Sequence, residues 1–107
     1  MFLINYNEFI PKRIYYLRNE KNVSARDMSL SLGQSESYIN KIENGRTMPS
    51  IQGLVYICEY FGITLKDFFD DEYNSPVKSK LLLKEIRKLK PEYVEHITTI
   101  IKDLNEK

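Results

Sequence analysis

The stretch "SLGQSESYINKIENG", residues Ser31–Gly45, decides how the rest of the chain is interpreted. A glycine stands near its start among serines, and an apolar rhythm follows that stops at the final Asn-Gly. The spacing predicts a short helix over about 36–44, with Tyr38, Ile39 and Ile42 facing inward or partly inward. Its outer face is polar but nearly uncharged, whereas a helix exposed only to solvent usually carries Glu/Lys pairs. This helix therefore offers small hydrogen-bonding side chains to its surroundings.

A second short helix precedes this one. Ser24-x-x-Asp27 is a variant of the capping box that opens helices, and it predicts a helix over about 25–32. Gly33 ends that helix, in the left-handed conformation that glycine adopts at low cost. We expect Ser35 to cap the helix that follows. Two short helices joined by a turn of about three residues form a helix-turn-helix.

Helical spacing continues on both sides, and no segment shows the alternation of a strand, which indicates an all-α protein. A first helix over about 8–21 should begin near Asn7, because Pro11 fits only a first turn. Thr64-x-x-Asp67 predicts a short fifth helix. The fourth helix opens at Pro49–Ser50 and ends at Gly62, with Ile51, Leu54, Ile57, Cys58 and Phe61 expected to face the core.

Two more amphipathic helices follow the acidic stretch "DFFDDEYNSP", which we interpret as a linker. They should begin at Pro76 and Pro91. Together they are too small to bury their apolar faces against each other, so we expect them to pack on the first domain or on a second copy. Their stripes are Leu82, Ile86 and Leu89 on one helix, and Val94, Ile97, Ile101 and Leu104 on the other.

Composition narrows the classes of function. The 107 residues are 42% hydrophobic and 29% charged, which is ordinary for a soluble domain, and the chain has no apolar run of membrane-spanning length. No signal peptide is apparent, and the single Cys58 suits a reducing compartment, so a cytoplasmic location is expected. A net charge of +1 gives no global signal for nucleic-acid binding, so any argument for such binding depends on local geometry.

In a helix-turn-helix the second helix lies in the DNA major groove and its N-terminal part meets base edges. Serine hydroxyls can donate or accept there, a lysine can reach guanine, and a glutamate can accept from cytosine. Four residues are therefore candidates for base readout: Glu36, Ser37, Asn40 and Lys41. The surrounding residues are candidates for phosphate contacts: Ser35, Asn44, Arg46 and Thr47.

At this point the chain resembles a known family. The segment "VSARDMSLSLGQSESYINKIENGRTMPS", Val23–Ser50, is similar to the phage-repressor and xenobiotic-response-element (XRE) class of helix-turn-helix regulators. The resemblance covers roughly residues 7–69. It implies a five-helix repressor-like DNA-binding domain over 1–73, usually used as a dimer on a two-fold operator. The helical hairpin over 74–107 would then be a C-terminal extension for dimerisation or partner binding.

The resemblance also assigns roles to individual residues. It implies an ion pair between Arg18 and Glu43 that ties the first helix to the third. Members of the family often carry a phosphate-binding glutamine at the position of Ala25. Alanine cannot make that contact, and Arg26, the next residue, is the candidate to replace it.

Other readings remain open at this stage. Helix-turn-helix shapes also occur as plain structure, and the last two helices could grip a partner protein, as in the antitoxin of a toxin–antitoxin pair. A homodimer interface is the reading that we favour for them. We expect no enzyme, metal or cofactor, because the sequence has no catalytic triad, ligand cluster or phosphate-binding glycine loop.

Overall fold

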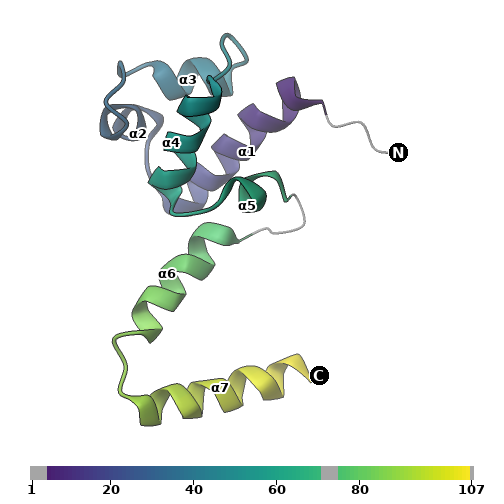
Figure 1. Ribbon diagram of the computed structural model, residues 1–107, viewed down its shortest axis with the longest axis vertical. Coiled ribbons are helices and arrows are strands. Elements are labelled where there is room, and N and C mark those ends of the chain that lie inside the picture. Colours follow the sequence, from purple (N-terminus) through teal and green to yellow (C-terminus); the bar gives the residue numbers. More distant parts are fainter. Residues whose placement is uncertain (1–4, 71–74, 107) are drawn as a thin grey trace.

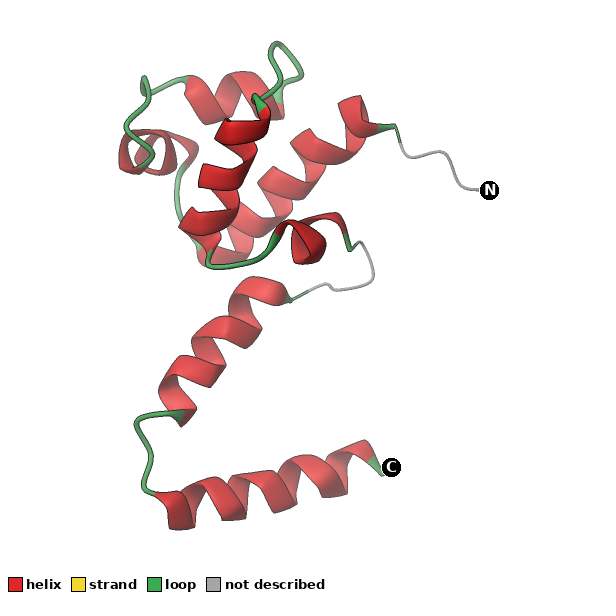
Figure 2. Ribbon diagram, viewed as in Figure 1, coloured by secondary structure: helices red, strands yellow, loops and turns green. Residues whose placement is uncertain are grey.

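The structure, a computed structural model of the chain, describes residues 5–70 and 75–106. Within these ranges every regular element is a helix, which confirms the predicted all-α class (Figure 1 and Figure 2). The predicted domain boundary at 73/74 and residues 71–74 of the acidic stretch lie outside the described residues. The interpretation of the whole stretch as a linker was wrong at its start, because residues 67–69 belong to the helix Leu65–Phe69. The helices are α1 (Tyr6–Lys21), α2 (Ala25–Ser31), α3 (Tyr38–Glu43), α4 (Ile51–Phe61), α5 (Leu65–Phe69), α6 (Pro76–Ile86) and α7 (Pro91–Asn105).

Helices α1 to α5 enclose one apolar core. Among the described residues, eleven buried side chains form the hydrophobic core cluster, and all but Val77 of α6 belong to these five helices. Pro11 of α1 and Pro76 of α6 are buried as well. The aromatic rings of Phe9, Phe68 and Phe69 stack and meet edge to face where α5 packs against α1. The other ten residues of the cluster are Ile10, Ile14, Leu17, Met28, Ile39, Ile42, Ile57, Cys58, Phe61 and Phe68.

Short polar side chains set where several helices begin, as their sequence predicts. The hydroxyl of Ser24 accepts a hydrogen bond from the Asp27 N–H at 3.0 Å, and Thr64 does the same for Asp67 at 3.0 Å. Ser50 accepts from the third residue of α4 at 3.0 Å. Each bond satisfies a backbone donor that has no partner within its own helix.

Two sequence-based expectations about helix ends were wrong. Because α1 already begins at Tyr6, capped by Asn5, Pro11 is its sixth residue and lies in the second turn. There it removes one intrahelical hydrogen bond, at a cost that its burial in the core must offset. Ile51, expected in the core, is 85% exposed, because it is the first residue of α4 and its neighbours Ser50 and Gln52 are exposed as well.

A buried arginine that the sequence did not reveal locks α5 to α1. Arg13 is 6% exposed, and its guanidinium donates to the carbonyl oxygens of Asp67 at 2.8 Å, Phe68 at 2.7 Å and Asp70 at 3.1 Å. These carbonyls lie at the C-terminal end of α5, where a positive charge is favourable. Arg13 therefore closes the core at the side from which the chain leaves toward α6.

The last two helices extend away from this core. In Figure 1, α6 leaves the domain on the side opposite α3, and α7 turns off at its far end. Only the first turn of α6 is buried, through Pro76 and Val77, and α7 has no buried residue. Leu89, expected on a helical face, lies beyond the end of α6 at Ile86.

Candidate nucleic-acid interface

A single serine joins the two helices of the helix-turn-helix. The hydroxyl of Ser29, buried in α2, accepts a hydrogen bond from the Ile39 N–H at 3.0 Å and donates one to the Ala25 carbonyl at 2.7 Å. Both hydrogen-bonding roles of the hydroxyl are thereby used, and the start of α3 is fixed against α2. The role of Ser29 was not predicted. The only signal in the sequence was a serine beside Met28 on the inward face of a helix.

This brace explains why α3 begins later than predicted. Gly33 has φ +74°, as expected for the turn, but α-helical bonding starts only at Tyr38. The expectation that the Ser35 side chain caps α3 was wrong, since the Ser35 carbonyl instead accepts from the Tyr38 N–H at 3.1 Å. Ser37 holds the N-cap position without a side-chain cap, because Ser29 already supplies the acceptor for Ile39.

The outward side of α3 and its C-cap carry three exposed polar side chains. They are Asn40, Lys41 and Asn44, and the Asn44 side-chain amide donates to the Asn40 side-chain carbonyl. Ser37, at the start of the same face, is half-buried. The Asn40 amide and the Lys41 ammonium group present donors and acceptors of the kind that read base edges in a major groove.

An exposed ion pair lies beside this face. Arg26 Nε of α2 is 3.1 Å from the Glu36 carboxylate in the turn before α3, and both side chains are about two-thirds exposed, at 67% and 66%. An ion pair so open to solvent contributes little to stability, about 1 kcal/mol or less. Both groups can therefore exchange this partner for DNA at small cost.

A bidentate ion pair anchors the other end of α3. Arg18 Nε and Nη2 donate to the two Glu43 carboxylate oxygens at 2.7 and 2.9 Å, and Nη1 donates to the Val23 carbonyl at 2.9 Å. The two side chains are only 13% and 10% exposed. The hydrogen bonds to Glu43 raise the pKa of Arg18 above its usual range, against the opposing effect of burial. Arg18 thus joins α1, the α1–α2 loop and α3 in one rigid unit.

The loop after α3 adds further exposed polar groups. Gly45 has φ +74° and turns the chain, and the Arg46 N–H then donates to the Lys41 carbonyl at 2.9 Å. Arg46 and Thr47 are exposed. Among the residues that the structure describes, Lys41 and Arg46 form no ion pair, so both cations face solvent beside the end of α3.

Close packing fixes the first residue of α3 on α4. A Cβ added at Gly53 would lie 2.9 Å from the Tyr38 hydroxyl and 3.2 Å from the Ser50 hydroxyl, so a larger residue there would have to displace the end of the tyrosine side chain. Burial raises the pKa of the Tyr38 phenol. Helix α3 is therefore held at its start by Ser29 and Tyr38 and at its end by Arg18.

Comparison with known families agrees with this geometry. The family model described as "Helix-turn-helix domain" matches residues 12–73, which include all five helices of the apolar core except the first turns of α1. The chain belongs to the XRE-type helix-turn-helix family. The matched range includes both α2 and α3.

Two curated relatives each match more than half of this chain. An uncharacterized HTH-type transcriptional regulator of Methanocaldococcus jannaschii is 33% identical over 66 residues, which are 59% of this chain and 100% of the relative. An HTH-type transcriptional regulator of Deinococcus deserti is 30% identical over 59 residues, which are 55% of this chain and 46% of the relative. No solved structure is significantly similar to the XRE-type chain.

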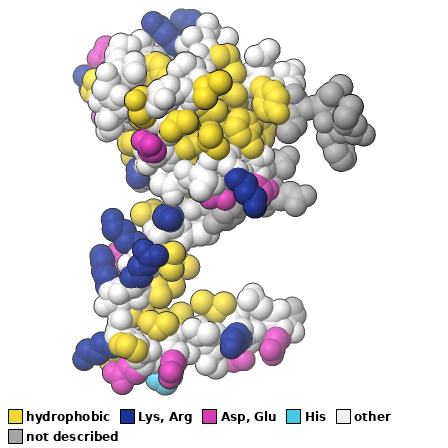
Figure 3. All heavy atoms as spheres, viewed as in Figure 1, with side chains coloured by type: hydrophobic (Ala, Val, Ile, Leu, Met, Phe, Trp, Pro, Cys, Tyr) yellow, Lys and Arg dark blue, Asp and Glu magenta, His cyan; other side chains and the backbone are white. Residues whose placement is uncertain are grey.

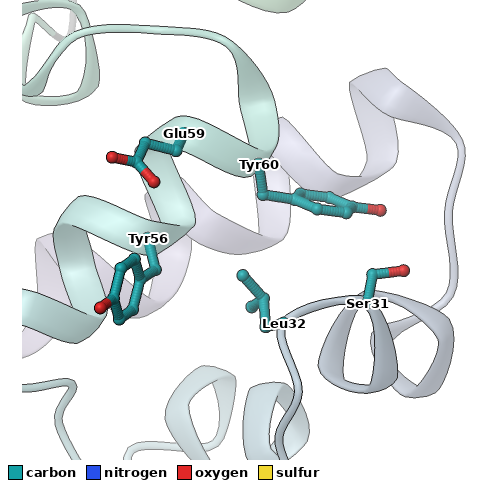
Figure 4. A pocket seen from close by; sticks show the side chains of 5 residues that line it. All are labelled: Ser31, Leu32, Tyr56, Glu59 and Tyr60. Atoms are coloured by element: carbon teal, nitrogen blue, oxygen red, sulfur yellow. The ribbon is translucent and has the colours of Figure 1, made fainter.

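The rest of the described surface includes a shallow hollow and no metal site. A shallow depression between the end of α2 and the outer side of α4 is lined by Ser31, Leu32, Tyr56, Glu59 and Tyr60 (Figure 4). In residues 5–70 and 75–106 no group of three or more His, Cys, Asp or Glu side chains could hold a metal ion. No helix in the described part of the chain is long and apolar enough to cross a bilayer.

Proposed function

We propose that this XRE-type protein binds a palindromic operator in double-stranded DNA as a homodimer and represses transcription. The observation that carries the proposal is the exposed polar face of α3, held at both ends by buried contacts. A recognition helix must keep its position to discriminate between bases, and the brace from Ser29 and the anchor from Arg18 supply that rigidity. A dimer that occupies a promoter represses by excluding other proteins, and such a regulator would act in the cytoplasm with its DNA.

In this proposal the site residues divide into two groups. Base readout falls on α3 and on the turn before it. Asn40 and Lys41 lie at the centre of this surface. Ser37 and Glu36 lie at its N-terminal end. Phosphate contacts come from the exposed groups around them: Arg26, Ser35, Asn44, Arg46 and Thr47. The phosphate contacts orient the domain on the duplex, and the base contacts select the sequence.

The pair formed by Arg26 and Glu36 connects the two groups. Arg26 can hold a phosphate only if its guanidinium points to the backbone, and the contact with Glu36 restrains it from one side. Glu36 would repel phosphates unless a cation stays close to it. We therefore expect the two residues to act together, with Glu36 accepting from a cytosine amino group while Arg26 balances its charge.

The homodimer is proposed from the exposed faces of α6 and α7. Figure 3 shows apolar side chains along the inner side of the angle between these helices, and charged side chains mostly on the outer side. Exposed apolar patches of this kind mark interaction surfaces. The large side chains exposed here include Leu81, Leu82, Leu83, Leu89, Ile100, Ile101 and Leu104.

Charge favours a second copy as the occupant. Residues 76–90 carry six basic side chains and one acidic side chain, whereas residues 91–106 carry four acidic side chains and one basic side chain. In a two-fold dimer α6 of one copy can pack on α7 of the other, so that basic and acidic flanks meet twice. Because α6 lies on the side of the domain opposite α3, its lysines are poorly placed to touch the operator that α3 reads (Figure 1).

Selection from random double-stranded DNA tests the proposed function. The full chain should enrich a palindromic motif, and its affinity for that motif should exceed nonspecific binding by about a thousandfold or more. Affinity should also fall steeply as salt rises, because phosphate contacts release counterions. If dimeric protein at low salt enriches no motif, the proposed DNA-binding function is wrong.

The antitoxin-like alternative gives a different result in a mass measurement. A chain that waits for a partner protein through α6 and α7 should be monomeric at tens of micromolar. A chain that pairs with itself should sediment as a dimer at the same concentration. A monomer would favour the alternative in which these two helices bind a partner protein.

A further inference from the structure

The joint between the DNA-binding domain and the C-terminal hairpin is built from specific contacts. The Glu20 carboxylate, in the last turn of α1, accepts hydrogen bonds from the backbone N–H groups of Val77 at 2.9 Å and Lys78 at 3.1 Å. These N–H groups belong to the first turn of α6 and have no partner within that helix. A carboxylate at a helix N-terminus is also favoured by the helix dipole.

Apolar packing completes the same joint. Val77 is 1% exposed and belongs to the domain core, and Pro76 beside it is buried as well. On the neighbouring side, Lys80 Cγ would lie 3.8 Å from a Cβ added at Gly62, so the lysine stem passes close to the loop after α4. The first turn of α6 therefore touches the end of α1 and the α4–α5 loop, and every residue of α6 from Lys78 to Glu85 is exposed.

The same stretch of α1 also holds the recognition helix. Arg18, two residues before Glu20, forms the bidentate pair with Glu43 at the end of α3. One helical turn thus fixes both the end of α3 and the start of α6. This turn of α1 therefore links α3 to the start of α6 through contacts of described residues.

We propose that Glu20 is a positioning residue that fixes the direction of the hairpin and so sets the half-site spacing that the dimer accepts. The inference rests on the proposed function, because it needs two recognition helices held by paired hairpins. Moving one half-site by one base pair shifts it by about 3.4 Å and rotates it by about 34° around the duplex, which follows from a turn of 10–10.5 base pairs in about 34 Å. A rigid joint cannot follow that rotation, whereas a loose joint can.

The joint can be tested inside one chain, without DNA. Spin labels at Gln52→Cys on α4 and Lys84→Cys on α6 occupy exposed positions, while Cys58 is buried and should stay unlabelled. Labelled protein is diluted with unlabelled protein so that only distances within one chain are measured by double electron–electron resonance. The parent should give one narrow distance distribution. Glu20→Ala should broaden it, and Glu20→Gln, which keeps an acceptor oxygen, should broaden it less.

The functional readout is a series of operators with altered spacing. The parent should lose about a hundredfold in affinity when the half-sites are moved apart by half a helical turn, which is within the range that bivalent binding contributes. Glu20→Ala should reduce that loss to a few-fold while leaving single half-site affinity and dimer dissociation unchanged. Glu59→Ala, an exposed carboxylate on α4, is the matched control and should keep the parent profile.

The outcomes separate the two proposals. Equal distance distributions and equal spacing profiles for parent and Glu20→Ala would overturn the role of Glu20, even if operator binding is strong. A parent that binds no selected duplex would overturn the proposed function, and the spacing role with it. Broadening of the distances together with a flatter spacing profile supports the inference. A uniform loss of stability with an unchanged profile would reduce Glu20 to a structural cap and overturn it.

Discussion

The two parts of the chain treat their apolar side chains in opposite ways. In α1 to α5 these side chains meet in one core, whereas in α6 and α7 only Val77 and Pro76 are buried. The first part therefore has a core of its own, although side chains such as Ile51 and Leu30 remain exposed on it. The second part has almost no core and carries an apolar pattern that needs another surface. In the proposed function, the first part specifies which DNA sequence is read and the second part specifies how many copies read it.

The ion pairs differ in the same way. Arg18 and Glu43 are nearly buried and joined by two hydrogen bonds, while Lys88 and Glu85 of the α6 region are 66% and 69% exposed at 3.2 Å. The buried pair fixes two helices against each other. The exposed pair connects neighbouring turns and contributes little. Substitutions in the first region should therefore change the stability of the domain, whereas changes in the second region should affect the pairing of two copies.

Removal of the hairpin should have the largest effect. A fragment of residues 1–80 keeps Val77 and the Glu20 cap, so the domain should remain folded but monomeric. Its affinity for the palindromic operator should fall by about a hundredfold to ten-thousandfold, because the second half-site is no longer held nearby. Binding titrations with the fragment and the full chain measure this loss. Affinity for a single half-site is the control and should not change. If the fragment binds the operator with an affinity within a few-fold of the full chain, the hairpin has no role in operator binding.

Neutralising the buried carboxylate should have the next largest effect. Glu43→Gln leaves the Arg18 guanidinium with little exposure and no counter-charge, and should cost about 3–5 kcal/mol of domain stability. Chemical denaturation measures this loss. Glu85→Gln, in the exposed pair, is the matched control and should cost about 1 kcal/mol or less. Equal costs for the two variants would mean that burial does not distinguish the pairs.

The sequence predicted the local parts of this structure, and among the long-range polar contacts it predicted only the Arg18–Glu43 pair, which the family resemblance implied. Gly33, the caps at Ser24 and Thr64, and the spacing of Ile39 and Ile42 specify helix ends and faces through neighbouring residues alone. Ser29 could not be recognised in this way, because its partner Ile39 becomes adjacent only after α2 and α3 pack. The same holds for Arg13 and Glu20, whose backbone partners lie more than fifty residues away in the sequence.

The site was predictable to a similar extent. Exposure of Asn40 and Lys41 follows from helical periodicity, because Ile39 and Ile42 face the core. The contacts between exposed groups do not follow from it. The Asn40–Asn44 hydrogen bond and the Arg26–Glu36 pair depend on side-chain conformations and on the late start of α3.

Within the first part, base and phosphate contacts can be separated by substitution. Lys41→Ala should cost about 1–3 kcal/mol and relax the preference at one base position. Arg46→Ala should weaken binding to all sequences alike and lower the salt slope by about one. Titrations on specific and random duplexes at several salt concentrations distinguish the two. Equal losses on both duplexes for Lys41→Ala would assign Lys41 to the phosphates.

The smallest effect concerns the buried thiol in α4. Burial, with a lesser contribution from the charge of Asp67, raises the pKa of Cys58 from 9.0 to about 11. As the pH rises through this interval the unfolded chain loses the thiol proton first, so folding stability should fall. The melting temperature of the parent should therefore drop more steeply between pH 9 and 11 than that of Cys58→Ala. Parallel curves would mean that the thiol is more accessible than its 3% exposure indicates.

Sedimentation of the full chain with a duplex that carries the selected palindrome tests the central claim most directly. The account predicts a complex of two chains per duplex, formed by protein that is already dimeric at tens of micromolar without DNA. The fragment of residues 1–80 should sediment alone as a monomer. A full chain that is monomeric without DNA, or that binds the palindrome as a single copy, would contradict the claim that α1 to α5 read the DNA and that α6 and α7 pair the readers.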